Sequence, residues 1–493
     1  MELINRFRGS NGAGTNSIML AFVQAITTVL GLVVTKLLSV NFSLQEYGTY
    51  SQALLVTSTA TSISILGLTD ATNYFYNKTK DKEKQRVYVS TIFTLQYIIG
   101  VICGVFVILL RAPISKYFKN DSLVSILPIV AFTPLFTNLI RMYQTLFVSI
   151  GKAKIFAIRN LIVSIVRLIA VFLACFVFSN IVTVLVVILF LDIIQIIYFC
   201  IFIKRYKVTI TIRDSRFHLT REIFSFSIPM SIYVLTNALS RDIDKYVISA
   251  FANTETLAIY SNAAKILPFD ILTTSLITVL IPIITRFINQ KLYSDAKDVF
   301  KLYLRIGYVL TFIIVGGAIA VSRDLMLFLY DEKYLIGLPV FVIYLIVDMI
   351  RFANVIAILS GAGKTKILMI VSITTMVLNA IFNIIGYKLI GLTGPALVTL
   401  LLTIGMTFAL LHFGAREIRT SILDLFDFKE ILIIGIQILV MGIITYWLSG
   451  LLASKQISYF ISLILCYGMY IVILGVLNYK RALQCYRQLN QYK

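Results

Sequence analysis

The sequence predicts an all-α polytopic membrane protein of about 14 transmembrane helices, built as two pseudo-symmetric six-helix lobes plus two C-terminal helices. Hydrophobic residues make up 59% of the chain and charged residues 14%, whereas a soluble domain is about 45–50% apolar and about 25% charged. Apolar runs of about twenty residues recur along the chain, each long enough to cross about 30 Å of hydrocarbon as a helix. An internal repeat with an offset of about 210 residues predicts the two lobes.

Short connections separate the expected spans, so the sequence leaves no room for a sizeable soluble domain. The fourteen expected spans are residues 16–39, 47–69, 87–110, 122–148, 155–178, 181–203, 222–248, 257–285, 300–321, 336–359, 365–387, 391–413, 430–450 and 456–478. The expected domains are an N-lobe over 1–210, a C-lobe over 211–420, and the last two spans with a tail over 421–493.

Connections rich in lysine and arginine alternate along the chain with connections that are poor in both. The connection NKTKDKEKQR at 77–86 and the tail at 478–493 are basic, while SN at 179–180 and SAFANTET at 249–256 contain neither residue type. By the positive-inside rule this asymmetry predicts that both termini are cytoplasmic. The net charge of +21 therefore reflects topology and contact with anionic lipid, not binding of nucleic acid.

Other functional classes find little support in the sequence. The short basic N-terminal stretch followed by a long apolar run predicts a first span and not a removable signal. The five cysteines have no metal or redox spacing, and the chain has only two histidines, so neither a metal site nor a cofactor is expected. The longest outer connection, RAPISKYFKND at 111–121, is too short to carry the acid and base groups of a membrane enzyme.

The stretch GAGKT at 361–365 resembles part of a nucleotide-binding loop. That loop needs a glycine five residues before Gly363 and a preceding strand, but Ile358 stands there and the long apolar run 339–360 precedes it. The nucleotide interpretation is therefore rejected.

An earlier segment explains this stretch. Residues 139–155 read LIRMYQTLFVSIGKAKI and residues 349–367 read MIRFANVIAILSGAGKTKI, and the same offset relates KLLSVNFSLQEYGTYSQA at 36–53 to KYVISAFANTETLAIYSNAAK at 245–265. Both Gly-Lys-x-Lys stretches are thus expected to be basic cytoplasmic turns after equivalent spans. A six-span repeat is parallel, with its axis along the membrane normal, and two such lobes around a central cleft suit alternating access.

Charged residues within the spans are the candidate site, because a charge at mid-bilayer costs about 2.5–3.5 kcal/mol on insertion scales. Arg141 and Arg167 have no acidic residue within four positions, so a partner must come from another helix, from water or from a ligand. Asp348 and Arg351 are three residues apart, and either neutralise each other or serve a ligand.

The seventh expected span contains RDIDK at 241–245. Helical spacing puts Arg241, Asp244 and Lys245 on one face and turns Asp242 elsewhere. Lys265 begins the descent of the next helix, near the expected outer end of this cluster. Arginine and lysine suit a phosphorylated ligand, while Asp242 and Asp244 could take up H⁺ or Na⁺.

The order and spacing of these features resemble polysaccharide flippases of the Wzx type, of the multidrug/oligosaccharidyl-lipid/polysaccharide (MOP) exporter superfamily. The segments that carry the resemblance are EYGTYSQA at 46–53, FSFSIPMSIYVLTNALSRDIDKYVIS at 224–249 and AIYSNAAKI at 258–266. The resemblance covers essentially the whole chain. It implies a MOP/MATE-like fold and a bacterial inner-membrane flippase, with H⁺ or Na⁺ as coupling ion and no other cofactor.

The implied substrate is an undecaprenyl-diphosphate-linked oligosaccharide destined for O-antigen or capsule. The partners that follow are this lipid, the bilayer and a polysaccharide polymerase machinery, with the protein itself a monomer. The substrate-binding residues that the resemblance implies are Arg141, Arg167, Arg241, Lys245, Lys265 and Arg351, with Asp242 and Asp244 for cation coupling. A lipid II flippase and a multidrug exporter of the same superfamily remain alternatives, although the basic charges fit a cationic drug poorly.

Overall fold

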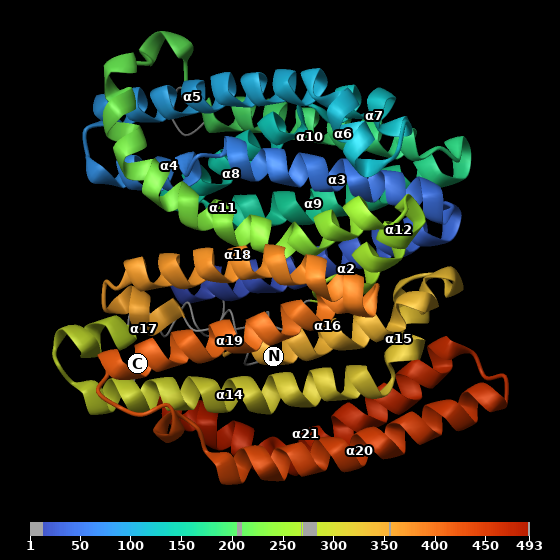
Figure 1. Cartoon of the computed structure of the whole chain (residues 1–493). Helices are drawn as coiled ribbons and strands as arrows, with labels where there is room; N and C mark the ends of the chain where they lie inside the picture. Colours follow the sequence, from blue (N-terminus) through green and yellow to red (C-terminus); the bar gives the residue numbers. More distant parts are fainter. Residues whose placement is uncertain (1–12, 205–209, 268, 270–282, 354–355, 492–493) are drawn as a thin grey trace. The chain divides into compact units, whose positions relative to one another are not determined.

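The computed structural model describes residues 13–204, 210–267, 269, 283–353 and 356–491. The chain divides into two compact units, Met1–Ala258 and Ile259–Lys493, and each is described by itself. Helices dominate both units, and the helices of each unit run side by side (Figure 1).

The first unit is a bundle of long helices interrupted by short breaks. Its α-helices are α2 (Ala13–Asn41), α3 (Leu44–Ser64), α4 (Leu68–Lys78), α5 (Lys82–Leu109), α6 (Arg111–Phe118), α7 (Ser122–Val130), α8 (Thr133–Ser149), α9 (Ala153–Leu173), α10 (Ile181–Lys204) and α11 (Thr220–Phe251). A π-helical turn, η1 (Ala174–Phe178), extends α9, and the 3₁₀ turns η2 (Ile212–Asp214) and η3 (Phe217–Leu219) precede α11. Helix α12 (Thr254–Ala263) starts in the first unit and ends in the second.

Besides a helical segment over 283–289, the second unit contains a further set of helices and helical turns. They are α14 (Tyr293–Ala320), α15 (Ser322–Leu329), η5 (Glu332–Gly337), α16 (Leu338–Arg351), α17 (Ile356–Gly361), α18 (Thr365–Ile390), α19 (Thr393–Glu417), η6 (Leu423–Leu425), α20 (Phe428–Ser454) and α21 (Tyr459–Gln491). Helices α20 and α21 lie beside each other and both pack on α14 (Figure 1).

The internal repeat is visible in the helix boundaries. Helices α14 and α15 begin 211 residues after α5 and α6, and α18 and α19 begin 212 residues after α9 and α10. The copies differ at the equivalent arginines, because α8 continues through Arg141 whereas α16 ends at Arg351. The predicted all-α, repeated architecture is therefore confirmed.

Twelve helices in the described residues are long and apolar enough to cross a membrane. The expected seventh span lies within α11, a single helix of 32 residues that is not among these twelve, and about half of the expected eighth span, 257–285, lies outside the described residues. The protein is a multi-pass membrane protein, and the count of fourteen is approximate. The expected boundaries at 210 and 420 stay a prediction.

The two Gly-Lys stretches have the same local geometry. Gly151 and Gly363 adopt left-handed backbone angles, with φ of 77° and 70°. The Lys152 N–H donates to the Phe147 carbonyl at 2.8 Å, and the equivalent bond from Lys364 is 2.7 Å long. This 6→1 bond is that of a helix-terminating Schellman turn. GAGKT thus follows a helix, α17, and the rejection of the nucleotide interpretation holds.

Aromatic packing fixes the first unit around α8. The Tyr143 and Phe199 rings stack at 5.2 Å, and the Phe93 ring lies 4.8 Å from that of Tyr143. These side chains join α5, α8 and α10 in one buried cluster.

Candidate functional site

The charged stretch of α11 forms an ion pair within its own helix. The Lys245 ammonium lies 2.7 Å from Asp242 Oδ1, and the Ser58 hydroxyl of α3 donates to Asp242 Oδ2 at 3.4 Å. Asp244 is 2% exposed and its Oδ1 accepts the Lys245 backbone N–H at 2.8 Å.

This arrangement corrects one expectation. Helical spacing placed Lys245 with Asp244 and turned Asp242 elsewhere, but the Lys245 ammonium reaches Asp242. The reason is side-chain length: four methylenes let the ammonium reach a residue one turn earlier, while the short carboxylate of Asp244 is held inward.

Two neighbouring helices hold this part of α11 in place. The Tyr246 hydroxyl is hydrogen-bonded to the Thr59 hydroxyl of α3 at 2.6 Å. The Tyr117 hydroxyl of α6 donates to the Tyr246 carbonyl at 3.0 Å. These two hydrogen bonds fix the position of the part of α11 that carries Asp242 and Lys245.

Two arginines of the first unit approach each other without a counter-charge. Arg141 on α8 and Arg241 on α11 are both exposed, and they lie close enough for their like charges to repel. No hydrogen bond or ion pair joins either guanidinium to another of the residues that the structure describes. Two guanidinium groups near each other can both bind the oxygens of one phosphorylated ligand.

Arg167 has a protein partner, by contrast. It lies 3.7 Å from Asp192 of α10, which also accepts a hydrogen bond from Gln195 at 3.0 Å. Of the three sources that the sequence left open for a partner of Arg167, the structure shows another helix. Its charge is partly neutralised, so it fits a ligand site less well than Arg141 does.

Arg159 of α9 was not among the residues predicted from the sequence. This side chain is 6% exposed, donates to Gln195, and lies with its guanidinium carbon 4.5 Å from the centre of the Phe199 ring. Its position inside the expected span 155–178 was the available signal. The cation–π contact explains how the charge is accommodated.

The second unit holds the remaining two predicted site residues. Arg351 lies 3.7 Å from Asp348, so these two side chains neutralise each other, as one of the two alternatives has it. The second carboxylate oxygen of Asp348 accepts the backbone N–H of Leu267 at 3.1 Å. Lys265, two residues earlier, is half-buried. Asp348 thereby fixes the chain just after Lys265.

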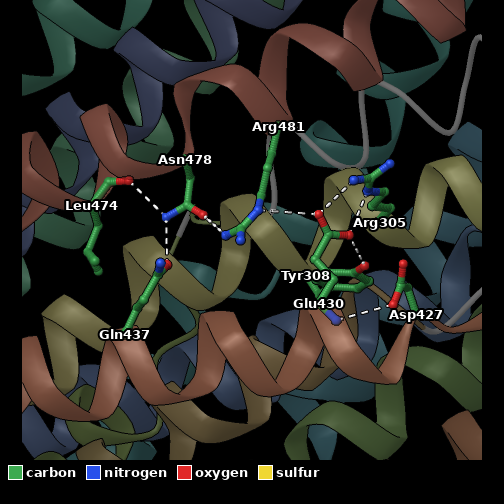
Figure 2. A network of polar contacts seen from close by, with 8 residues as sticks. All are labelled: Arg305, Tyr308, Asp427, Glu430, Gln437, Leu474, Asn478 and Arg481. Atoms are coloured by element: carbon green, nitrogen blue, oxygen red, sulfur yellow. Dashed lines mark hydrogen bonds and ion pairs between the residues drawn. The ribbon is translucent and has the colours of Figure 1, made fainter.

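A larger ionic network in the second unit was also missed. Arg305 of α14 and Arg481 of α21 both approach the carboxylate of Glu430 on α20, as Figure 2 shows. These residues are far apart in sequence and lie near the ends of apolar runs, where charges are ordinary. Sequence spacing alone therefore gave no signal.

The described residues contain no group of three or more His, Cys, Asp and Glu side chains placed to hold a metal ion. The cationic and hydroxyl groups of the first unit instead suit an anionic ligand. These observations define the class: a multi-pass helical membrane protein made of two equivalent helix series, with two neighbouring arginines in the first that no described residue pairs.

The chain belongs to the polysaccharide biosynthesis protein family, whose model matches residues 13–288. None of the curated proteins compared with it matches significantly. Several solved structures share its fold.

The lipid II flippase MurJ, in an inward closed conformation, is 17% identical, with a TM-score of 0.73 over 94% of this chain and 100% of that chain. An inward-facing multidrug resistance MATE transporter of the MOP superfamily is 11% identical, with a TM-score of 0.66 over 82% of this chain and 98% of that chain. A MOP transporter from Pyrococcus furiosus, described as having a binding pocket of reverse polarity, is 13% identical, with a TM-score of 0.57 over 82% and 94%.

Proposed function

We propose that this protein is a Wzx-type flippase that moves an undecaprenyl-diphosphate-linked oligosaccharide from the cytoplasmic to the outer leaflet of a bacterial inner membrane. The family assignment and the shared fold support a flippase of lipid-linked substrates. The protein works by alternating access, as a monomer with both termini cytoplasmic. Polymerase machinery takes up the product for O-antigen or capsule synthesis.

The observation that carries this proposal is the approach of Arg141 and Arg241. Two like charges that lie near each other on α8 and α11 repel, and an anion bound by both would remove this cost in free energy. A diphosphate supplies two adjacent acceptor groups for two guanidinium groups. A cationic drug would add to the repulsion, so the multidrug alternative fits poorly.

The other cations extend the proposed substrate site. Lys245 lies one turn from Arg241 on α11, and its ammonium is held by Asp242 at 2.7 Å. Binding of a diphosphate would draw this ammonium away from Asp242. Arg167, Lys265 and Arg351 complete the proposed substrate-binding residues. Arg351 is the least available of them to a ligand, because it is paired with Asp348.

The coupling ion is proposed to act at Asp242 and Asp244. Release of Lys245 leaves the Asp242 carboxylate with only the Ser58 hydroxyl as a described donor. A proton or Na⁺ can then neutralise it. The substrate and Asp242 would thus compete for Lys245, so binding of the substrate would free Asp242 for the ion and link the two binding events.

A lipid II flippase is the second candidate. The MurJ structure covers 94% of this chain, more than the 82% covered by the MATE structures. The substrates of both candidate flippases carry a diphosphate on a prenyl chain, so the two arginines could bind either substrate. Viability separates them, because loss of a sole lipid II flippase is lethal, whereas loss of a capsule or O-antigen flippase is tolerated.

Depletion of the protein in its host tests the proposal. We expect lipid-linked oligosaccharide to accumulate in the cytoplasmic leaflet, and Arg241→Ala, Arg141→Ala and Lys265→Ala to reproduce this with normal amounts of folded protein. Arg323→Ala, an exposed arginine on α15, is the matched control and should export normally. Full export by both Arg141→Ala and Arg241→Ala would refute the role of the pair.

A further inference from the structure

A second basic site lies at one end of the second unit, apart from the charged residues of the spans. It is a cavity of about 650 Å³ where α14 begins, α19 ends and the chain turns into η6. Its lining includes Tyr293, Lys297, Arg416, Arg419, Ser421 and Asp424. By the distribution of lysine and arginine, this end is the predicted cytoplasmic one.

The cavity has an excess of positive charge. Its three cations, Lys297, Arg416 and Arg419, face a single carboxylate, Asp424, which leaves a net charge of +2. That carboxylate is already engaged by the Ser421 hydroxyl at 3.0 Å, and the Ser421 hydrogen bonds together with the charge of Lys297 lower the pKa of Asp424 below its usual value. The two arginines are exposed and remain available for an anion.

Arg419 is held in place by an unusual turn. Its φ is 54°, a left-handed angle that favours glycine, and the following residue, Thr420, donates its N–H to the Ala415 carbonyl at 3.0 Å. This is the position that glycine usually takes after a helix. The Arg419 guanidinium lies 4.7 Å from the centre of the Tyr293 ring, so the strained turn presents the cation at the wall of the cavity.

Exposed apolar side chains flank the cavity in the sequence. Leu292 precedes Tyr293 and is 44% exposed, Leu423 precedes Asp424 and is 68% exposed, and Phe428 at the start of α20 is 55% exposed. A site for free phosphate needs no such side chains. Acyl chains bound beside a phosphate do, because their apolar surface must be covered.

We propose that this cavity binds the phosphate headgroup of an anionic phospholipid in the leaflet at that face. Arg416 and Arg419 contact the phosphate oxygens, the Ser421 hydroxyl adds a donor, and the flanking leucines and Phe428 contact the acyl chains. Basic pockets between helices at the cytoplasmic side are known to suit such headgroups. This inference does not depend on the transported substrate.

Lipid titration of the full-length protein tests the site. The purified protein in phosphatidylcholine nanodiscs is titrated with phosphatidylglycerol, and bound lipid is counted by native mass spectrometry. The test variant combines Arg416→Gln with Arg419→Gly, since glycine suits the left-handed turn and removes the guanidinium. We expect its affinity for phosphatidylglycerol to fall at least about tenfold, as two charge-assisted contacts are lost.

Lys455→Gln, an exposed residue at the opposite end of α20, is the control and should bind like the wild type. Equal binding by the double variant and the wild type would overturn the proposal. Binding of phosphatidylethanolamine by the wild type with the same affinity as phosphatidylglycerol would also overturn it. Binding of inorganic phosphate by the wild type without lipid, lost in the double variant, would indicate a site for free phosphate. This outcome would also contradict the lipid proposal.

Discussion

The Glu430 carboxylate on α20 accepts two hydrogen bonds from the Arg305 guanidinium on α14, at 2.6 Å and 2.7 Å (Figure 2). The Tyr308 hydroxyl donates a third at 2.7 Å, and Arg481 of α21 lies 3.7 Å away. With Glu430 only 6% exposed, one carboxylate joins α14, α20 and α21.

Replacement of Glu430 by alanine should destabilise the second unit. It leaves Arg305 and Arg481 without their shared counter-charge, and breaking a buried ion pair from one side costs about 3–5 kcal/mol. Thermal unfolding in detergent, followed by circular dichroism, measures the loss. The neighbouring exposed residue supplies the control, Lys429→Gln, and an equal midpoint for both variants would contradict a structural role for the network.

The opposite ends of α20 and α21 are joined through a second carboxylate. Asp324 of α15, 5% exposed, accepts hydrogen bonds from Ser449 at 2.7 Å and Ser462 at 2.6 Å. Loss of both bonds in Asp324→Ala should cost about 3 kcal/mol or more, at about 1.5–3 kcal/mol for each bond to a charged group.

Single substitutions Ser449→Ala and Ser462→Ala separate the two contributions. Each should destabilise the protein by less than Asp324→Ala does, because the carboxylate keeps one donor. The midpoint of thermal unfolding is again the measurement. If the serine variants unfold like the wild type while Asp324→Ala does not, the two bonds are not what holds these helix ends.

Alanine at Gly363 should destabilise the turn after α17. The left-handed φ of 70° costs a residue with a Cβ about 1–2 kcal/mol, and Gly151→Ala should cost the same because Gly151 has a φ of 77° in a turn with the same 6→1 bond. Gly442→Ala within α20, where an added Cβ meets nothing within 4 Å, should instead be neutral or stabilising. Nucleotide binding by the purified protein, tested with ATP, should be absent in all three variants and in the wild type.

Much of the fold follows from local sequence. The apolar runs give the helices, and the repeat of Gly-Lys-x-Lys gives the equivalent turns, because each depends on residues within one helix or turn. The single helix α11 was expected despite its charged stretch RDIDK. The end of α16 at Arg351 was not, since nothing around that residue distinguishes it from the continuous helix at Arg141.

The site was less predictable, because pairing between helices depends on packing. Asp192 lies 25 residues beyond Arg167 in the sequence, and Glu430 lies 125 residues beyond Arg305. Neither separation has a helical or strand period that would reveal the contact. The proximity of Arg141 and Arg241 likewise depends on tertiary structure, because α8 and α11 both pack on α3 and α4, although both residues were selected as unusual charges.

Acid should release the segment before α11. Asp214 accepts hydrogen bonds from Arg86 and Thr211, which lower its pKa to about 2. A carboxyl whose folded pKa is depressed stabilises the fold fully above its unfolded pKa of about 3.9, and this contribution is lost as the pH falls toward 2. Amide hydrogen exchange at Thr211 and Arg216, whose N–H groups donate to α5, should therefore lose protection between about pH 4 and pH 2.

Asp214→Asn is the control for this titration. It removes the ionisable group, so exchange at the same two amides should be faster at neutral pH. The protection factors of these amides should then show no loss between pH 4 and pH 2 that is due to a carboxyl at this position. A wild-type protection factor that stays constant from pH 4 to pH 2 would contradict the assignment.

Arg141→Gln should separate stability from transport. The variant removes the repulsion between Arg141 and Arg241. The substrate-free protein should therefore unfold at the same temperature as the wild type or slightly above it. The free energy of unfolding should rise by no more than about 1 kcal/mol, as for an accessible charge pair. A structural arginine behaves in the opposite way: Arg305→Gln should lower the midpoint, since it leaves Glu430 with fewer donors.

Transport by the same variant gives the second measurement. If the two guanidinium groups bind a diphosphate together, Arg141→Gln should lose export of the lipid-linked oligosaccharide while keeping or gaining stability, and Arg241→Gln should do the same. Arg141→Lys should restore part of the export, because the charge returns without the bidentate geometry. A variant that is both less stable and fully active would show that Arg141 supports the fold and does not contact the substrate.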